Sequence, residues 1–253
     1  MAVIVGWRWW YQACISAVIA MLMLLSAPIA HAEEDVDLLL VLAADVSRSI
    51  DDAKFKLQRD GYAAAIADPA IVKAMQTAGP KRRIGLIFIE WAGVGETKVI
   101  VDWSSIGSQA EATRFADTIA AAPRPFYGRT SIAGAIDVAM EQLRASPFKS
   151  DRRLIDISGD GTNNSGRDIG EARDQAVGQG IVINGIVILS AVPLPFNPAH
   201  THPPGGLLAY YQNNVIGGVG SFAVAAEGFE TFGQALRSKL IKEISALVSG
   251  RRG

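Results

Sequence analysis

Two acidic residues and three hydroxyl residues stand where they could together hold a hard metal cation. Asp45, Ser47 and Ser49 form an Asp-x-Ser-x-Ser pattern that follows an apolar run. Asp160 stands on a Gly-flanked turn after another apolar run, and Thr130 opens a helical stretch. Mg²⁺ takes six oxygen ligands and keeps several of them as water. The residue types therefore predict a Mg²⁺ (or Mn²⁺) site with a position left for an acidic group of a partner.

Each of these residues also has an ordinary structural interpretation. Ser49 and Asp52 have the spacing of a capping box, and Thr130 or Ser131 could cap the helix that follows. An Asp-x-Ser-x-Ser pattern alone is expected by chance in roughly one chain of this length in twenty. The position of the segments at strand ends favours metal binding, because in doubly wound sheets ligands bind beyond the carboxyl ends of the strands.

Apolar runs alternate with helical patterns along the chain. Nearly continuous apolar runs are typical of strands that are covered on both faces. The expected strands are 36–44, 83–91, 98–103, 153–158, 181–189 and a short one near 220–225. Apolar stripes predict helices from Ser49 to Asp68 and over 108–121, 130–145, 167–179 and 229–247. The sequence thus predicts an α/β fold with a doubly wound, mostly parallel six-stranded sheet and one antiparallel edge strand, 98–103.

The first 32 residues have the features of a secretory signal peptide. Arg8 precedes an apolar run from Ile15 to Leu25, and Ala30-His31-Ala32 offers a cleavage site. We expect residues 33–253 to form a single exported domain, periplasmic or secreted, with no membrane span after cleavage. An uncleaved anchor is the alternative, because Ala13 to Ala30 is about as long as the shortest membrane-spanning helices.

The composition excludes several classes of protein. The chain has 253 residues, 49% of them hydrophobic, with 24 Lys and Arg against 25 Asp and Glu. A disordered or fibrous protein is excluded by the hydrophobic content, and a nucleic-acid binder driven by bulk charge is excluded by the charge balance. Cys14 is the only cysteine. Since it precedes the expected cleavage site, the exported domain would form no disulfide.

The five candidate ligands resemble the metal-ion-dependent adhesion site (MIDAS) of the von Willebrand factor A (VWA) family. The family pattern is Asp-x-Ser-x-Ser on the first loop, Thr on the second and Asp on the third, and all five positions are filled here. The resemblance spans nearly the whole of residues 33–253. Glu90-Trp91-Ala92-Gly93, Ser158-Gly159-Asp160-Gly161 and Asn184-Gly185 are also similar to a bacterial VWA-like family, domain of unknown function eleven ninety-four. The resemblance implies a protein partner whose Asp or Glu carboxylate completes the coordination of the metal.

Other polar residues have less specific interpretations. Asp156 alternates with Ile155 and Ile157, which predicts a buried structural carboxylate. Glu90 ends the second strand, where it would either support the site or hold a loop. Asn163 and Asn164 are expected to form a turn, and the alternative is that one of them lines the rim of the site.

The sequence lacks the residue patterns that an enzymatic interpretation requires. His200 and His202 are the only histidines after the expected cleavage site, both in a Pro-rich loop, 193–206, where we expect a solvated turn. No Gly-x-Ser-x-Gly elbow accompanies them. We therefore predict a binding protein without catalytic residues. Two alternatives stay open. One is a structural VWA-like protein without functional metal, and the other is a Mg²⁺-dependent aspartyl phosphotransferase with Asp45 as nucleophile, which lacks a second acid at position 47.

The Pro-rich loop 193–206 is expected to help choose the partner. It follows a parallel strand, and it must therefore emerge at the same edge of the sheet as Asp45 and Asp160. A stiff surface loop without contacts is the alternative.

Overall fold

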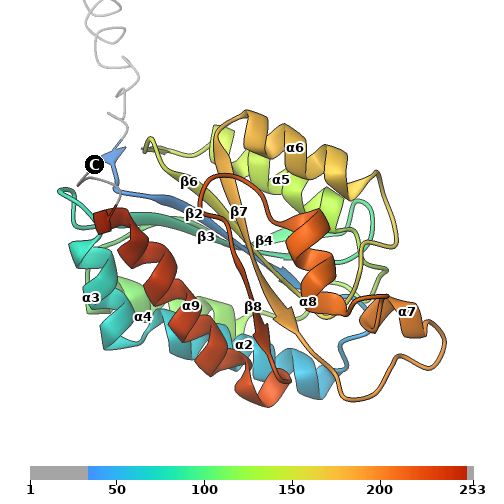
Figure 1. Cartoon of the computed structure of the whole chain (residues 1–253). Coiled ribbons are helices and arrows are strands. Elements are labelled where there is room, and N and C mark those ends of the chain that lie inside the picture. The colour runs from blue at the N-terminus through green and yellow to red at the C-terminus, as the bar shows by residue number, and fades with distance from the viewer. Residues whose placement is uncertain (1–33, 250–253) are drawn as a thin grey trace, which may run out of the picture. The chain divides into compact units, whose positions relative to one another are not determined.

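A computed structural model describes residues 34–249, in which strands and helices alternate around a six-stranded sheet (Figure 1). The strand order is β4-β3-β2-β6-β7-β8. Only β3 and β4 pair antiparallel, and the other neighbours are parallel. The predicted α/β fold, with a mostly parallel sheet and one antiparallel edge strand, is confirmed. The strands are β2 Leu39–Asp45, β3 Ile84–Trp91, β4 Thr97–Ile106, β6 Arg153–Gly159, β7 Ile181–Ile188 and β8 Ala223–Ala226.

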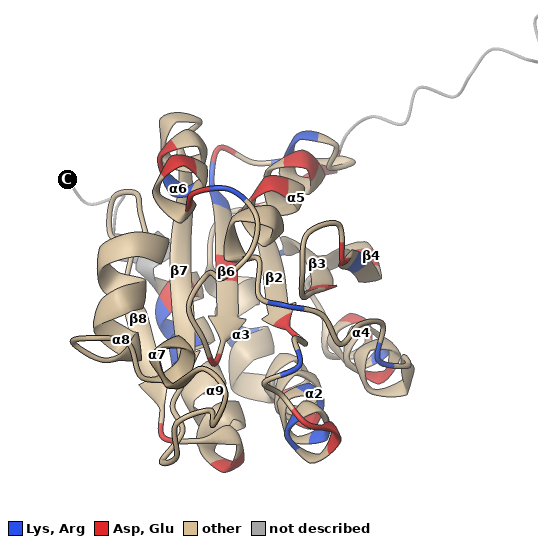
Figure 2. Cartoon of the chain, turned by 90° about the vertical axis from the view of Figure 1, so that its right-hand side faces the viewer, with Lys and Arg blue, Asp and Glu red and all other residues tan. Residues whose placement is uncertain are grey.

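Helices cover both faces of this sheet (Figures 1 and 2). One face carries α2 Asp52–Ile66, α3 Pro69–Thr77, α4 Gln109–Ala121 and α9 Phe229–Ser249, and the other carries α5 Ile132–Arg144 and α6 Ile169–Gly178. In β2, Leu40 and Leu42 pack in the same core cluster as Phe232 of α9, whereas Val41 packs with Ile136 of α5. Because side chains alternate between two covered faces, both sets must be apolar, which explains the nearly continuous apolar runs.

Three parts of the fold differ from the sequence expectation or were not anticipated. The expected helix break at Asp68-Pro69 is followed at once by α3, because Asp68 accepts a hydrogen bond from the Ala70 N–H at 2.7 Å and Pro69 fits the first helical position. A small parallel sheet joins β1 (Glu34–Asp35) to β5 (Phe148–Lys149). Beyond β7 the chain forms α7 (Pro198–Thr201), α8 (Leu207–Tyr210) and a π-helical turn, η1 (Tyr211–Val215).

The predicted signal peptide, residues 1–32, lies outside the described residues. Within residues 34–249, no helix combines the length and the apolar character that crossing a lipid bilayer requires.

A buried ionic cluster lies between the sheet and α9. Lys239 of α9 is fully buried, and its Nζ lies 2.6 Å from Oδ1 of Asp156 and also contacts Glu243. Asn184 of β7 donates a hydrogen bond to Glu243 Oε1 at 2.7 Å. Burial, together with the charge of Asp156, raises the pKa of Glu243 to about 7. The expectation that Asp156 is a buried structural carboxylate is confirmed, and its partner is Lys239.

Candidate metal centre

The five predicted ligands lie together at the carboxyl edge of the sheet. Asp45 ends β2 and Asp160 directly follows β6, and these two strands are parallel neighbours. Ser49 Oγ donates to Asp160 Oδ1 at 2.6 Å and lies 3.0 Å from Ser47 Oγ. Thr130 Oγ1 lies 3.2 Å from Ser47 Oγ, and the Ser47 N–H donates to Asp45 Oδ1 at 2.7 Å. The oxygens of three separate segments therefore form one contiguous group.

The helix caps next to this group are made by other residues. Asp51 caps α2 by accepting a hydrogen bond from the Lys54 N–H, and Ser131 caps α5 by accepting one from the Gly134 N–H. Ser49 and Thr130 instead direct their hydroxyl groups toward Asp160 and Ser47. Helix capping thus does not explain the presence of either hydroxyl.

The two carboxylates of the group are buried close to one another. Asp45 is fully buried, and its Oδ2 accepts no hydrogen bond from the residues that the structure describes. Burial raises the pKa of Asp45 well above its usual range, and the charge of Asp160 raises it further. Burial also raises the pKa of Asp160, against the hydrogen bond from Ser49. A divalent cation would neutralise both charges and give the unpartnered oxygen a ligand role, so the donor set fits a hard metal ion.

Charged side chains and imidazoles alone do not form a metal site in the described part of the chain. Within residues 34–249, no group of three or more His, Cys, Asp or Glu side chains could hold a metal ion. The site would therefore combine two carboxylates with neutral oxygens, as hard ions accept.

Arg124 and Gln58 hold the first loop in place. The Arg124 guanidinium donates to the carbonyl oxygens of Val46 at 2.8 Å, Ser47 at 3.1 Å and Ile50 at 2.7 Å. Gln58 Nε2 donates to the Asp45 carbonyl at 2.8 Å. Sequence analysis missed both residues, because neither belongs to a motif.

Asn163 and Asn164, which were expected to form a turn, hold the start of α5. Asn164 Oδ1 accepts a hydrogen bond from the Thr130 N–H at 3.0 Å, and Asn163 Oδ1 accepts one from the Ala133 N–H at 3.2 Å. These two bonds link the loop after β6 to the backbone that carries the Thr130 hydroxyl.

The expectation that His200 lies in a solvated turn is wrong. His200 is only 3% exposed, and its Nε2 lies 3.3 Å from Thr130 Oγ1. Its ring fills the space that a Cβ at position 161 would occupy, so Gly161 is needed for this close approach. Burial and the charge of Arg48 lower the pKa of His200. His202, in contrast, is exposed.

The hydrogen bonds around the His200 ring assign its tautomer. Because the Asn164 Oδ1 faces the Thr130 N–H, the Asn164 amide nitrogen is the atom that lies 3.3 Å from His200 Nδ1. Nδ1 then accepts, and in the neutral ring Nε2 carries the proton. His200 therefore donates to Thr130 Oγ1 and holds that hydroxyl in position. The sequence feature that could have indicated this contact is the long loop after β7, because that loop must emerge at the carboxyl edge of the sheet.

Tyr211 lies against the site, whereas Glu90 joins β3 to α2. Tyr211 is fully buried, and burial with the charges of Asp45 and Asp160 raises the pKa of its phenol well above the usual range. A Cβ at Gly159 would lie 2.5 Å from the Tyr211 hydroxyl. Glu90 binds Arg59 of α2 through both oxygens, each at 2.8 Å. Of the two roles expected for Glu90, the structure shows the one that holds neighbouring segments together.

Sequence comparison matches the chain to one family. The family described as "Protein of unknown function (DUF1194)" matches residues 35–248. No curated protein matches the chain in sequence.

Solved structures with a similar fold include VWA proteins. Proximal thread matrix protein 1 from the mussel byssus, with a zinc-occupied MIDAS motif, has a TM-score of 0.55 at 13% identity, over 85% of this chain and 49% of that one. A von Willebrand factor type A protein from Catenulispora acidiphila has a TM-score of 0.55 at 12% identity, over 83% and 43%. Manganese-loaded TRAP protein of Plasmodium vivax has a TM-score of 0.51 at 16% identity, over 83% and 73%.

These similarities show a VWA-like fold. The matched part spans about half the length of the mussel protein, so the remainder of that protein has no counterpart in the comparison.

Proposed function

The chain belongs to the DUF1194 family and has a VWA-like fold, and from this premise we propose that it binds a divalent metal ion and, through the metal, a protein partner. The metal is Mg²⁺ or Mn²⁺, and the partner offers an Asp or Glu carboxylate. The role is binding, and we assign no catalytic residue.

The observation that carries this proposal is the unpartnered oxygen of Asp45. A fully buried carboxylate oxygen without a hydrogen bond is costly, and a second buried carboxylate, Asp160, increases that cost. Asp45 and Asp160 would supply the charge, and three hydroxyls would complete the protein ligands: Ser47, Ser49 and Thr130. When bound, the ion supplies a positive centre to which a carboxylate from outside attaches. The zinc-occupied and manganese-loaded structural neighbours support a divalent ion in a fold of this kind.

Calorimetric titration of chelator-treated protein with Mn²⁺ and with Mg²⁺ tests the proposal. We expect one ion to bind per chain. A flat titration with both ions would favour the structural alternative, a VWA-like protein without functional metal. Incubation with a phosphoryl donor tests the other alternative, since a covalent phosphoryl adduct on Asp45 would identify a phosphotransferase.

Substitution of His200 should weaken metal binding. His200→Ala removes the donor that holds the Thr130 hydroxyl, and partners of metal ligands typically contribute about 10-fold to 100-fold in affinity. We expect about a tenfold higher Kd for Mn²⁺ in the same titration. His202→Ala is the matched control, because His202 belongs to the same loop and is exposed. Equal Kd values for wild type and His200→Ala would show that His200 only fills space.

We also propose that the protein is exported and cleaved after Ala32. Mass spectrometry of the exported protein should then find Glu33 as the first residue. Retention of residues 1–32 in a membrane fraction would favour the uncleaved anchor, and the domain would then be tethered to a membrane.

A further inference from the structure

A cavity of about 540 Å³ adjoins the candidate metal centre. Its lining includes the hydroxyl residues Ser49 and Thr130, and His200 forms part of its wall. Arg48 and Arg129 also line it, together with an apolar rim from the loop before α7. That rim consists of Leu194, Pro195 and Phe196. The cavity is thus continuous with the proposed ligands and has a wall that the Pro-rich loop supplies.

The charge of this cavity is not balanced by its own lining. Neither Asp nor Glu is among the lining residues. Arg48 is exposed, and its guanidinium forms no hydrogen bond or ion pair with any residue from 34 to 249. Arg129 is also exposed and donates only to the neutral Asn164, to its carbonyl at 2.8 Å and to its side-chain oxygen at 3.5 Å. Two cationic groups therefore face one space without an acidic partner.

The cavity would keep its excess of positive charge with the metal bound. A divalent ion would be neutralised by Asp45 and Asp160, so Arg48 and Arg129 would contribute two positive charges to the surroundings of the open position. One carboxylate on the metal offsets only one of them. A ligand that complements this cavity carries a second negative group.

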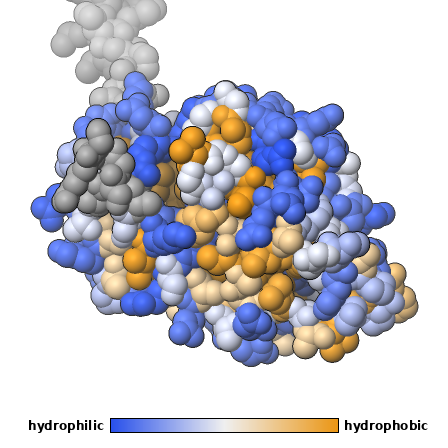
Figure 3. Space-filling model, in the orientation of Figure 1, coloured by the Kyte–Doolittle hydropathy of each residue, from blue (hydrophilic) through white to orange (hydrophobic). Residues whose placement is uncertain are grey.

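The rim favours a protein segment over a small molecule. The Phe196 side chain is 99% exposed, and Val192 of the same loop is 70% exposed. Figure 3 shows apolar surface on the side of the molecule where Figure 1 places α7. A peptide chain can cover such a rim with a neighbouring side chain, whereas a small diacid that fills the polar part of the cavity leaves the rim in water.

We propose that this cavity binds a protein segment that carries two acidic side chains, one for the metal and one for Arg48 and Arg129. This inference rests on the proposed function, because it takes the metal-bound carboxylate as the first of the two contacts. It adds the chemistry of the partner: an acidic pair beside an apolar residue.

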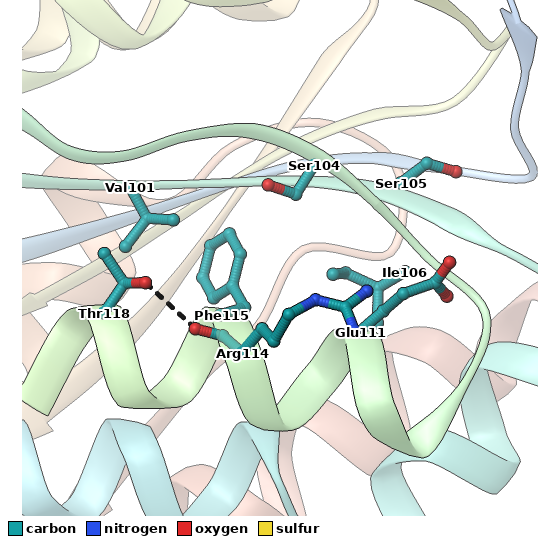
Figure 4. A pocket seen from close by; sticks show the side chains of 8 residues that line it. All are labelled: Val101, Ser104, Ser105, Ile106, Glu111, Arg114, Phe115 and Thr118. Carbon is teal, nitrogen blue, oxygen red and sulfur yellow. Dashed lines mark hydrogen bonds between the residues drawn. The ribbon is translucent and has the colours of Figure 1, made fainter.

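A second cavity of about 270 Å³ supplies a control arginine for the first cavity (Figure 4). It lies between α4 and the end of β4, and Ser105 and Ile106 of that strand pair with Gly85 and Ile84 at the start of β3. It is therefore at the opposite edge of the sheet from Asp45. Arg114 lines it, but Glu111 lines it too and balances the charge. Arg114 is exposed, and its guanidinium forms no hydrogen bond or ion pair with the described residues.

Fluorescence anisotropy with labelled Gly-Ser peptides in the presence of Mn²⁺ tests the proposal. One peptide carries a single Asp, and the others carry a second acidic residue one to four positions away. We expect the best two-acid peptide to bind about tenfold more tightly than the one-acid peptide, as for an added charge-assisted contact. Arg48→Gln should remove most of that gain. Arg114→Gln, which removes the same charge elsewhere, should keep it.

Three outcomes would overturn the inference. If the one-acid peptide binds in a Mn²⁺-dependent way and no second acid improves it, the acidic pair is wrong and the proposed function stands. If neither Mn²⁺ nor any peptide binds, the proposed function fails and the inference fails with it. If free glutarate competes as strongly as the two-acid peptide, the ligand is a small dicarboxylate and not a protein segment.

Discussion

Saturation with Mn²⁺ or Mg²⁺ should raise the free energy of unfolding by about 2.7 kcal/mol when the ion is present at about 100 times its Kd. The reason is that the five ligands come from three separate segments, so the site does not exist in the unfolded chain. For a domain of this size, the melting temperature should rise by roughly 5 to 10 °C. Thermal unfolding with metal and with EDTA measures the difference.

Asp45→Asn should abolish the stabilisation by metal. Without metal, the variant should be at least as stable as wild type. Burial and the charge of Asp160 raise the pKa of Asp45, so at a pH above the unfolded pKa this carboxyl lowers the stability of the metal-free fold, because it must either stay ionised in the interior or take up a proton. The neutral amide removes that cost. We therefore expect Asp45→Asn to melt no lower than wild type in EDTA and clearly lower in saturating metal.

The comparison of melting temperatures with metal and with EDTA distinguishes a metal ligand from a structural residue. A purely structural Asp45 would make the variant less stable under both conditions. Asp117→Asn is the matched control, because Asp117 is exposed on α4 and its carboxylate forms no hydrogen bond or ion pair with the described residues. If metal shifts the melting temperature of Asp45→Asn as much as that of wild type, the ion binds elsewhere.

The fold was predictable because burial on both faces leaves a strong signal. The strands β2, β3, β6 and β7 are nearly continuous apolar runs, which is the pattern that a parallel strand covered on both faces requires. Parallel strands then place their carboxyl ends at one edge. Asp45 and Asp160 could therefore be expected to lie close together although 115 positions separate them in the sequence. The observed hydrogen bond of Ser49 to Asp160 joins residues 111 positions apart.

The surroundings of the site could not be predicted in the same way. The contact of His200 with Thr130 joins residues that are 70 positions apart, and that of Arg124 with Val46 joins residues 78 apart. Arg124 projects from an irregular loop and His200 from α7, which has only four residues, so no periodicity reports the burial of either side chain. Pro69 misled the helix assignment for a different reason, since proline is compatible both with a break and with the first turn of a new helix.

Lys239→Met should lower the free energy of unfolding by about 3 to 5 kcal/mol near neutral pH, the usual cost when one partner of a buried ion pair is removed. Lys239 is the only cation among the described residues in contact with the buried pair Asp156 and Glu243. Methionine retains most of the side-chain volume, so the loss reports charge and not a cavity. Lys242→Met is the matched control, because Lys242 is exposed and packs 3.9 Å from the centre of the Phe222 ring.

The loss caused by Lys239→Met should also depend on pH, in a direction that a packing defect would not produce. Burial raises the pKa of Glu243 from 4.5 to about 7, and Lys239 lowers the pKa of both carboxyls against that effect. An acid whose pKa is higher in the folded state contributes stability below its unfolded pKa, and this contribution is lost as the pH rises through the folded pKa. Without Lys239, both carboxyls should hold their protons to higher pH. The variant should therefore be closest to wild type in urea unfolding near pH 5 and furthest below it near pH 8. A deficit that is the same at both pH values would mean that Lys239 acts through packing, and the two carboxyls would then be neutral in the folded protein throughout this range.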